Sequence, residues 1–168
     1  MRYVFWLLVA AYTGLLIWAA FELPERVPMH FNGSGEVDNW GSRGSALLTF
    51  ALIGAGVVVL FGGMAWLAGR KSLNVGWINL PHKEWWTETP QRVARLHILL
   101  REDLYFMAAV TMGILVVALA STVWAGQQSD PRMPSWAMIL IGVLVAAIIA
   151  RAIWMVARRY RPQELELP

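Results

Sequence analysis

Residues 46–69 read ALLTFALIGAGVVVLFGGMAWLAG and contain no charged side chain. An α-helix of about 20 apolar residues is long enough to cross the ~30 Å hydrocarbon core of a bilayer. Three further stretches of this kind occupy residues 4–21, 104–125 and 135–157, and only the last holds a charge, Arg151, placed near its end, where the side chain can snorkel. The predicted fold class is therefore all-α integral membrane, with four transmembrane helices in a bundle that forms a single domain over residues 1–168.

Composition supports this class. The chain is 58% hydrophobic and 15% charged, with a mean hydropathy of +0.51, which is more apolar than a soluble domain of this size. The first apolar stretch is longer than a usual signal-peptide core and no A-x-A site follows it, so we expect it to be retained. The chain has no cysteine, which excludes disulfides and thiolate metal sites.

Basic residues predict the orientation, because Lys and Arg concentrate on the cytoplasmic side of membrane proteins. If both termini are cytoplasmic, ten basic residues lie inside and three lie outside, with Arg151 uncounted. The inside set is Arg2, Arg70, Lys71, Lys83, Arg92, Arg95, Arg101, Arg158, Arg159 and Arg161, and the outside set is Arg26, Arg43 and Arg132. Six tryptophans fall near predicted span ends, as interfacial anchors do: Trp6, Trp18, Trp66, Trp124, Trp136 and Trp154. The lipid bilayer is thus an expected partner, and no nucleic-acid motif is present.

A polar segment at residues 22–45 is predicted to be a structured external loop. Pro24 and Pro28 disfavour helix at the residues before them, and Gly33 and Gly35 permit a tight turn. Three hypotheses fit this segment: it is a structural turn alone, a loop that recognises a peptide or other ligand, or a site of metal or proton chemistry. The ligand-recognition candidates are His30, Asn32, Glu36, Asp38 and Trp40.

Metal and enzyme chemistry have weak support in this loop. A calcium loop of the EF-hand type fails on its required positions, since Val37 and Arg43 stand where that pattern needs glycine and glutamate. His30 and Asp38 remain weak candidates for a divalent cation or for an acid–base pair. Neither H-E-x-x-H nor G-x-S-x-G occurs in the chain, so we expect no metal, no cofactor and no enzymatic activity.

The cytoplasmic loop at residues 70–103 carries a second group of candidates. Thr89-Pro90 is a typical helix start, and an apolar face follows it, which predicts a cytoplasmic interfacial helix near residues 90–103. His82, Glu84 and His97 match no zinc spacing. The candidates for contact with a cytoplasmic partner or lipid are Asn79, His82, Lys83, Glu84, Arg92 and Arg95.

Two motifs resemble a known bacterial family. LPERVPMHFNGSGEVDNWGSR (residues 23–43) is similar to the pattern L-P-x-x-(I/V)-P-x-H-F-x-x-x-G-x-x-D-x-W of a bacterial membrane domain of unknown function, which also forms the N-terminal part of SdpI-type immunity proteins. INLPHKEWWTETPQR (residues 78–92) resembles a cytoplasmic stretch found in many of these proteins. The positions that match the first pattern are Leu23, Pro24, Val27, Pro28, His30, Phe31, Gly35, Asp38, Trp40, Ser42 and Arg43.

The resemblance implies a multi-pass protein of the bacterial cytoplasmic (inner) membrane. It implies immunity to a secreted toxic peptide, with an extracytoplasmic peptide or toxin as one partner and a cytoplasmic regulator or membrane protein as another. The chain departs from full-length immunity proteins, because we expect it to lack their additional C-terminal helices. The alternatives are a metal- or proton-dependent membrane enzyme that uses His30 and Asp38, and an accessory subunit of a transporter.

Overall fold

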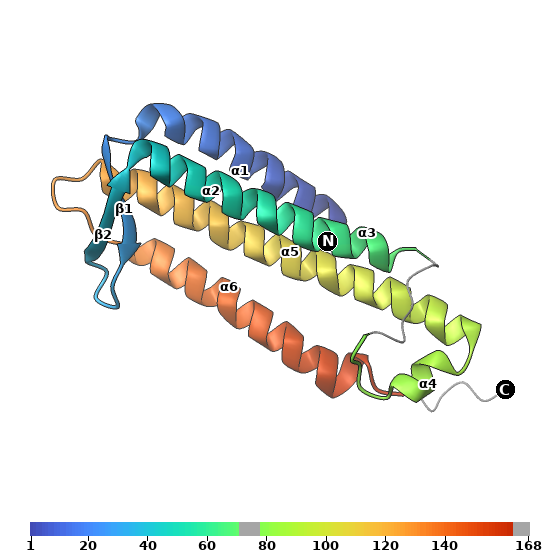
Figure 1. Cartoon of the computed structure of the whole chain (residues 1–168). Coiled ribbons are helices and arrows are strands. Elements are labelled where there is room, and N and C mark those ends of the chain that lie inside the picture. Colours follow the sequence, from blue (N-terminus) through green and yellow to red (C-terminus); the bar gives the residue numbers. More distant parts are fainter. Residues whose placement is uncertain (71–77, 163–168) are drawn as a thin grey trace.

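The computed structural model of the chain describes residues 1–70 and 78–162, so Lys71, counted above among the basic residues, lies outside the described part. Four long helices run alongside one another, and a two-stranded hairpin lies across one end (Figure 1). The elements, in chain order, are α1 (Arg2–Glu22), β1 (Arg26–Phe31), β2 (Val37–Ser42), α2 (Arg43–Val57), the π-helical turn η1 (Val58–Gly62), α3 (Gly63–Ala68), α4 (Lys83–Thr87), α5 (Pro90–Gly126), α6 (Ser135–Trp154) and the π-helical turn η3 (Met155–Arg159).

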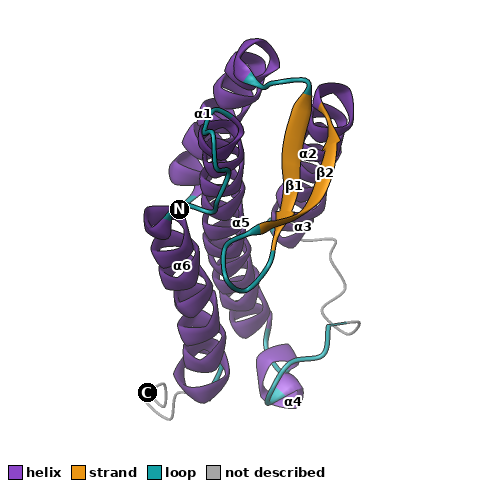
Figure 2. Cartoon of the chain, turned by 90° about the vertical axis from the view of Figure 1, so that its left-hand side faces the viewer, coloured by secondary structure: helices purple, strands orange, loops and turns teal. Residues whose placement is uncertain are grey.

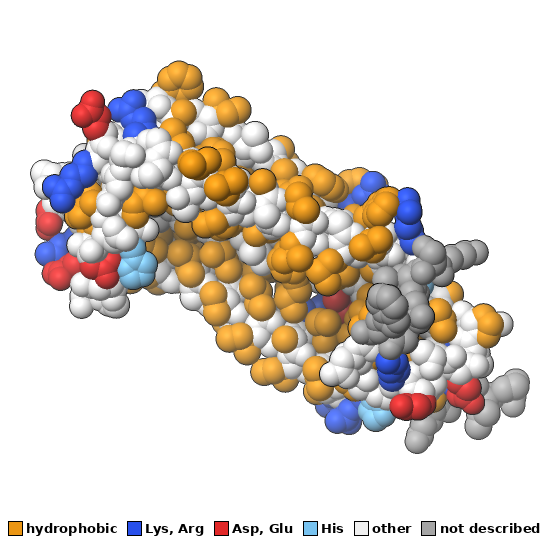
Figure 3. All heavy atoms as spheres, viewed as in Figure 1, with side chains coloured by type: hydrophobic (Ala, Val, Ile, Leu, Met, Phe, Trp, Pro, Cys, Tyr) orange, Lys and Arg blue, Asp and Glu red, His pale blue; other side chains and the backbone are white. Residues whose placement is uncertain are grey.

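The four predicted spans are confirmed as helices long and apolar enough to cross a membrane. They are Arg2–Glu22, Arg43–Ala68, Pro90–Gly126 and Ser135–Arg159. Large apolar side chains cover their outward faces, whereas charged side chains gather at the two ends (Figure 3). In the span that begins with α6, no residue of the most apolar 18-residue stretch is buried against the rest of the protein, so its side chains need an apolar solvent. The six tryptophans named above are all exposed, as interfacial anchors must be.

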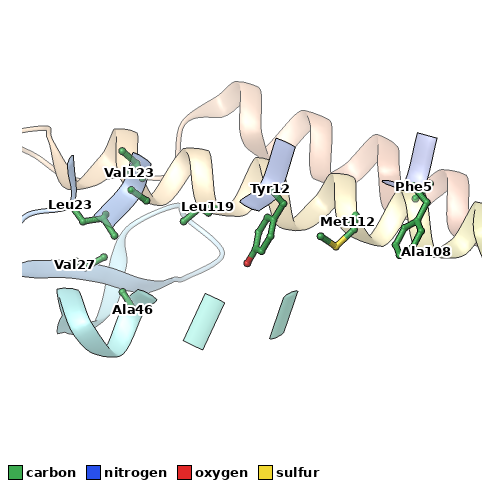
Figure 4. Packing of buried hydrophobic residues seen from close by; sticks show 11 residues of the cluster. Phe5, Tyr12, Leu23, Val27, Ala46, Ala108, Met112, Leu119 and Val123 are labelled. Carbon is green, nitrogen blue, oxygen red and sulfur yellow. The ribbon is translucent and has the colours of Figure 1, made fainter. Parts of the chain in front are cut away.

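Helix α5 is the central element of the fold. It contacts α1, α2, η1, α3 and α6 along its length, and α1 makes the most extensive of these packing surfaces. The core between the helices is built from Phe5, Tyr12, Ala108, Met112 and Leu119, which lie in a line in Figure 4. Small residues allow close approach in this core, as helix pairs in membranes generally require.

The external loop predicted at residues 22–45 contains a β-hairpin, so the chain is not all-α. Helix α1 ends at Glu22 before the Leu23-Pro24 pair, and strands β1 and β2 then pair antiparallel from Arg26↔Ser42 to Phe31↔Val37. Val27 and Pro28 of β1 are buried. The hairpin lies over the ends of α2 and α5 (Figure 2). The short strands were missed because proline and glycine in the segment argue locally for a turn.

The predicted interfacial helix near residues 90–103 is not a separate element. Thr89 caps the helix start as expected, accepting a hydrogen bond from the N–H of Arg92, but the helix then continues unbroken to Gly126. Part of its apolar face is covered by the protein itself, because Leu96 packs with Trp86 of α4 and Tyr160 in a second core. Partly buried Val93 and Leu100 complete that packing.

The described termini lie at the end opposite the hairpin (Figure 1). We call the end with β1, β2 and the connection 127–134 the hairpin end. The other end, with Met1, α4 and η3, is the terminal end. The N-terminus and α4 lie at the terminal end, and Tyr160 lies there too because it contacts Trp86 of α4.

Candidate functional sites

The hairpin turn is stabilised by its own side chains. Asn32 Oδ1 accepts hydrogen bonds from the backbone N–H groups of Ser34 (2.9 Å) and Glu36 (3.0 Å). Gly35 has φ +79°, which an L-residue with a side chain adopts only with strain. The side-chain oxygen of Asn32 therefore builds the turn.

Substituting alanine at Gly35 tests this turn. We expect Gly35→Ala to lower the free energy of unfolding by about 1 kcal/mol, because a side chain in the left-handed region is strained. The added methyl would lie in ordinary contact with Met133 at 3.5 Å, so strain is the main effect. Gly33→Ala is the control, because open space surrounds that position. Thermal melting in detergent should separate the two variants, and equal melting temperatures would contradict the assignment.

His30 and Asp38 face each other across the hairpin. Their Nδ1 and Oδ1 atoms lie 2.6 Å apart, and the side chains are 67% and 44% exposed. Register shifts around His30 interrupt the regular pairing, since His30 pairs with Asn39 and Phe31 with Val37, which leaves Asp38 without a cross-strand partner. Such bulges reorient side chains and often mark sites. The pair is thus an accessible acid–imidazole couple on the outer surface of the hairpin.

The other two recognition candidates are occupied by local contacts. The guanidinium of Arg26 stacks over the ring of Trp40 at 4.6 Å. Glu36 forms an antiparallel bridge with Arg132 and lies 3.7 Å from its side chain, and the N–H of Met133 donates to the Gly35 carbonyl at 2.8 Å. The five candidates therefore share one hairpin, but only His30 and Asp38 meet as side chains. Within the described residues no group of three metal-ligating side chains is found, here or elsewhere.

The predicted cytoplasmic candidates lie around α4 at the terminal end. His82 has φ 56° and precedes the helix, while Asn79, His82 and Glu84 are exposed. Arg92 is used internally: it pairs with Glu88, donates to the Trp85 carbonyl at 3.3 Å and stacks on the Trp85 ring at 4.1 Å. The remaining two candidates, Lys83 and Arg95, also have interaction partners. His97 is buried within α5, apart from the exposed surface of His82.

A buried charge cluster at the terminal end was not predicted. Asp103 of α5 is 2% exposed, and its carboxylate accepts hydrogen bonds from Arg151 Nε (3.0 Å), Arg159 Nε (3.0 Å) and the Tyr160 hydroxyl (2.7 Å). Arg159 also pairs with exposed Glu102 at 2.6 Å. Arg151 therefore does not snorkel as expected, because it is turned inward to Asp103 and joins α6 to α5.

The cluster also fixes the chain after α6. Tyr160 is buried, and its carbonyl accepts a hydrogen bond from the indole N–H of Trp86 at 3.0 Å. Burial and the hydrogen bond to Asp103 raise the pKa of Tyr160, since both favour the neutral phenol. One sequence signal could have revealed the Arg151–Asp103 pair. Arg151 is the only charge within a predicted span, and Asp103 directly precedes another predicted span. Opposite charges in neighbouring spans commonly pair.

The fold and these sites define a multi-pass helical membrane protein with a small β-hairpin at one end of its helices. Residues 7–55 match a family described as a domain of unknown function (DUF1648). The matched segment includes most of α1, the whole hairpin and most of α2, so it contains the His30–Asp38 pair. Comparisons with curated proteins and with solved structures gave no significant match.

Proposed function

We propose that this chain is a non-enzymatic protein of the bacterial cytoplasmic membrane that recognises an extracytoplasmic peptide through its hairpin. In this proposal both termini are cytoplasmic and the hairpin end faces outward, in agreement with the distribution of basic residues. The role is that of an SdpI-type immunity or signal-response protein, as the motif resemblance implies. The hairpin lies within the segment that matches the domain family.

The proposed peptide recognition rests on the outer edge of β2. Each strand of a two-stranded sheet has one unpaired edge, and an extended peptide can add to such an edge as a new strand. Strand β1 contacts both α5 and α2, whereas the main contacts of β2 are with β1 and α2. The start of this edge is already paired within the chain, because Glu36, just before β2, forms a backbone bridge with Arg132. Beyond Glu36, Asp38 and Asn39 are exposed, which leaves room for a bound strand beside the His30–Asp38 pair.

A toxin-challenge assay tests the proposal. Bacteria expressing the chain would be exposed to culture medium from a strain that secretes a toxic peptide, and survival would be counted. We expect wild type to protect and His30→Ala or Asp38→Ala to lower protection at least tenfold, because the pair borders the binding edge. Asp130→Ala removes an exposed carboxylate at the same end and should protect as wild type does. Full protection by both hairpin variants, at equal membrane levels, would refute hairpin recognition.

The alternatives have less support. A metal-dependent enzyme would need at least one more ligand beside His30 and Asp38, and the described residues hold no group of three such side chains. An accessory role in a transporter has one supporting observation, the exposed apolar face of α6, against which another membrane helix could pack. A cytoplasmic regulator would meet the exposed residues Asn79, His82 and Glu84 near α4.

A further inference from the structure

A basic hollow opens at the terminal end, next to the Asp103 cluster. Its volume is about 440 Å³, and three segments line it: the beginning of α1, the end of α3 with the two residues that follow it, and the first half of α5. These segments contribute Arg2, Arg70 and Arg101 respectively. Lys and Arg side chains are visible at this end of the molecule in Figure 3.

The positive charge of the hollow is not neutralised by the described part of the chain. None of the three arginines forms an ion pair with a described residue. Glu102, the one acidic residue in the lining, is already paired with Arg159 at 2.6 Å. Three guanidinium groups around one hollow therefore offer donors to an anion, and their planar geometry suits the oxygens of a phosphate.

Two of the arginines are held in place by their neighbours. The guanidinium of Arg70 stacks over the Trp66 ring at 3.5 Å. Arg101 passes beside Gly69, where an added Cβ would lie 3.3 Å from its Cδ and 3.4 Å from Nη1. The absence of a side chain at Gly69 thus makes space for Arg101. Arginines that are already positioned lose less conformational freedom when they bind a ligand.

The surroundings of the hollow identify the anion as part of a lipid. Trp66, which lines the hollow, is 56% exposed, and Tyr3 and Val4, which follow Arg2 on α1, are exposed apolar residues. A headgroup phosphate in the hollow would place its acyl chains against this surface. Basic pockets at the ends of membrane helices are the usual sites for anionic lipid headgroups.

We propose that this hollow binds the phosphate headgroup of an anionic phospholipid through Arg2, Arg70 and Arg101. The site is distinct from the hairpin and does not depend on peptide recognition. Free phosphate shares the headgroup chemistry, but it lacks the acyl chains that would contact α1 and α3. The lipid should therefore bind far more tightly than the free ion.

The test uses the full-length protein in detergent micelles with fluorescent phosphatidylglycerol, and the dissociation constant is measured by titration. We expect Arg70→Gln/Arg101→Gln to weaken binding at least tenfold. Arg26→Gln/Arg132→Gln removes the same charge at the hairpin end and should change binding less than twofold. Gly69→Val is a second variant that keeps every charge, and it should also weaken binding because it displaces Arg101.

Two further titrations identify the ligand chemistry. Fluorescent phosphatidylcholine should bind at least tenfold more weakly than phosphatidylglycerol, and 10-fold molar excess of inorganic phosphate over the lipid should not displace the lipid. Binding should weaken as sodium chloride increases, since salt screens exposed charges. Equal binding of both lipids, unchanged binding by the double variant, or displacement by inorganic phosphate would each overturn the proposal.

Discussion

Replacing Asp103 with asparagine is expected to lower the free energy of unfolding by about 3–5 kcal/mol, as is typical when one partner of a buried ion pair is removed. The carboxylate is 2% exposed and accepts from Arg151, Arg159 and Tyr160. Asparagine keeps the size but not the charge, so two guanidinium groups would lose their buried counter-ion. Because Arg151 and Arg159 lie on α6 and η3, the attachment of the last helix to α5 should weaken first.

The neighbouring residue provides a matched control. Glu102→Gln removes one negative charge from the same turn of α5, but Glu102 is 57% exposed and its pair with Arg159 lies toward solvent. An exposed pair contributes about 1 kcal/mol or less. Unfolding of both variants by denaturing detergent should therefore show a large shift for Asp103→Asn and a small one for Glu102→Gln. Shifts of equal size would show that burial of Asp103 does not determine its contribution.

Local sequence predicted the spans because the relevant signals are local. Length and hydropathy alone place the predicted span 46–69 on Arg43–Ala68 and the span 135–157 on Ser135–Arg159. Capping signals are equally local, so Thr89 starts α5 as the sequence indicates. The predicted span 104–125 lies within α5, which begins at Pro90. The first turns of α5 are stabilised by packing against Trp86 and Tyr160, which hydropathy cannot reveal.

The sites depend on contacts between distant residues, and there the sequence was less informative. His30 and Asp38 could be named from their chemistry, but their 2.6 Å approach follows from a bulged hairpin register. Asn32, Glu36 and Trp40 looked equally polar or aromatic in sequence, and each has a partner within or beside the hairpin. Asp103 and Tyr160 were not predicted. The charges of Arg151 and Asp103 were the only sequence signal of the cluster, and contacts between residues 48 and 57 positions apart depend on how the helices pack.

Gly54→Ala is expected to destabilise the helix packing by about 1–3 kcal/mol, the usual cost of overpacking a core. Gly54 is buried on α2 against the Tyr12 ring of α1. A Cβ at this position would lie well inside van der Waals contact with Tyr12 Cε1 and 3.2 Å from both Cδ1 and Cζ. The ring has little freedom to move, because the Tyr12 hydroxyl donates to the Phe50 carbonyl at 2.7 Å. The methyl group must therefore separate α1 from α2 or break that hydrogen bond.

Gly56→Ala on the same helix is the control, since nothing lies within 4 Å of its added Cβ. It should be neutral or slightly stabilising, because alanine favours helix over glycine by roughly 1 kcal/mol. Repeating both substitutions in a Tyr12→Ala background isolates the contact, because effects that share one contact are not additive. Without the tyrosine ring, Gly54→Ala should melt at the temperature of its parent. If it remains as destabilising as in the wild-type background, the cost arises from the α2 backbone and not from contact with Tyr12.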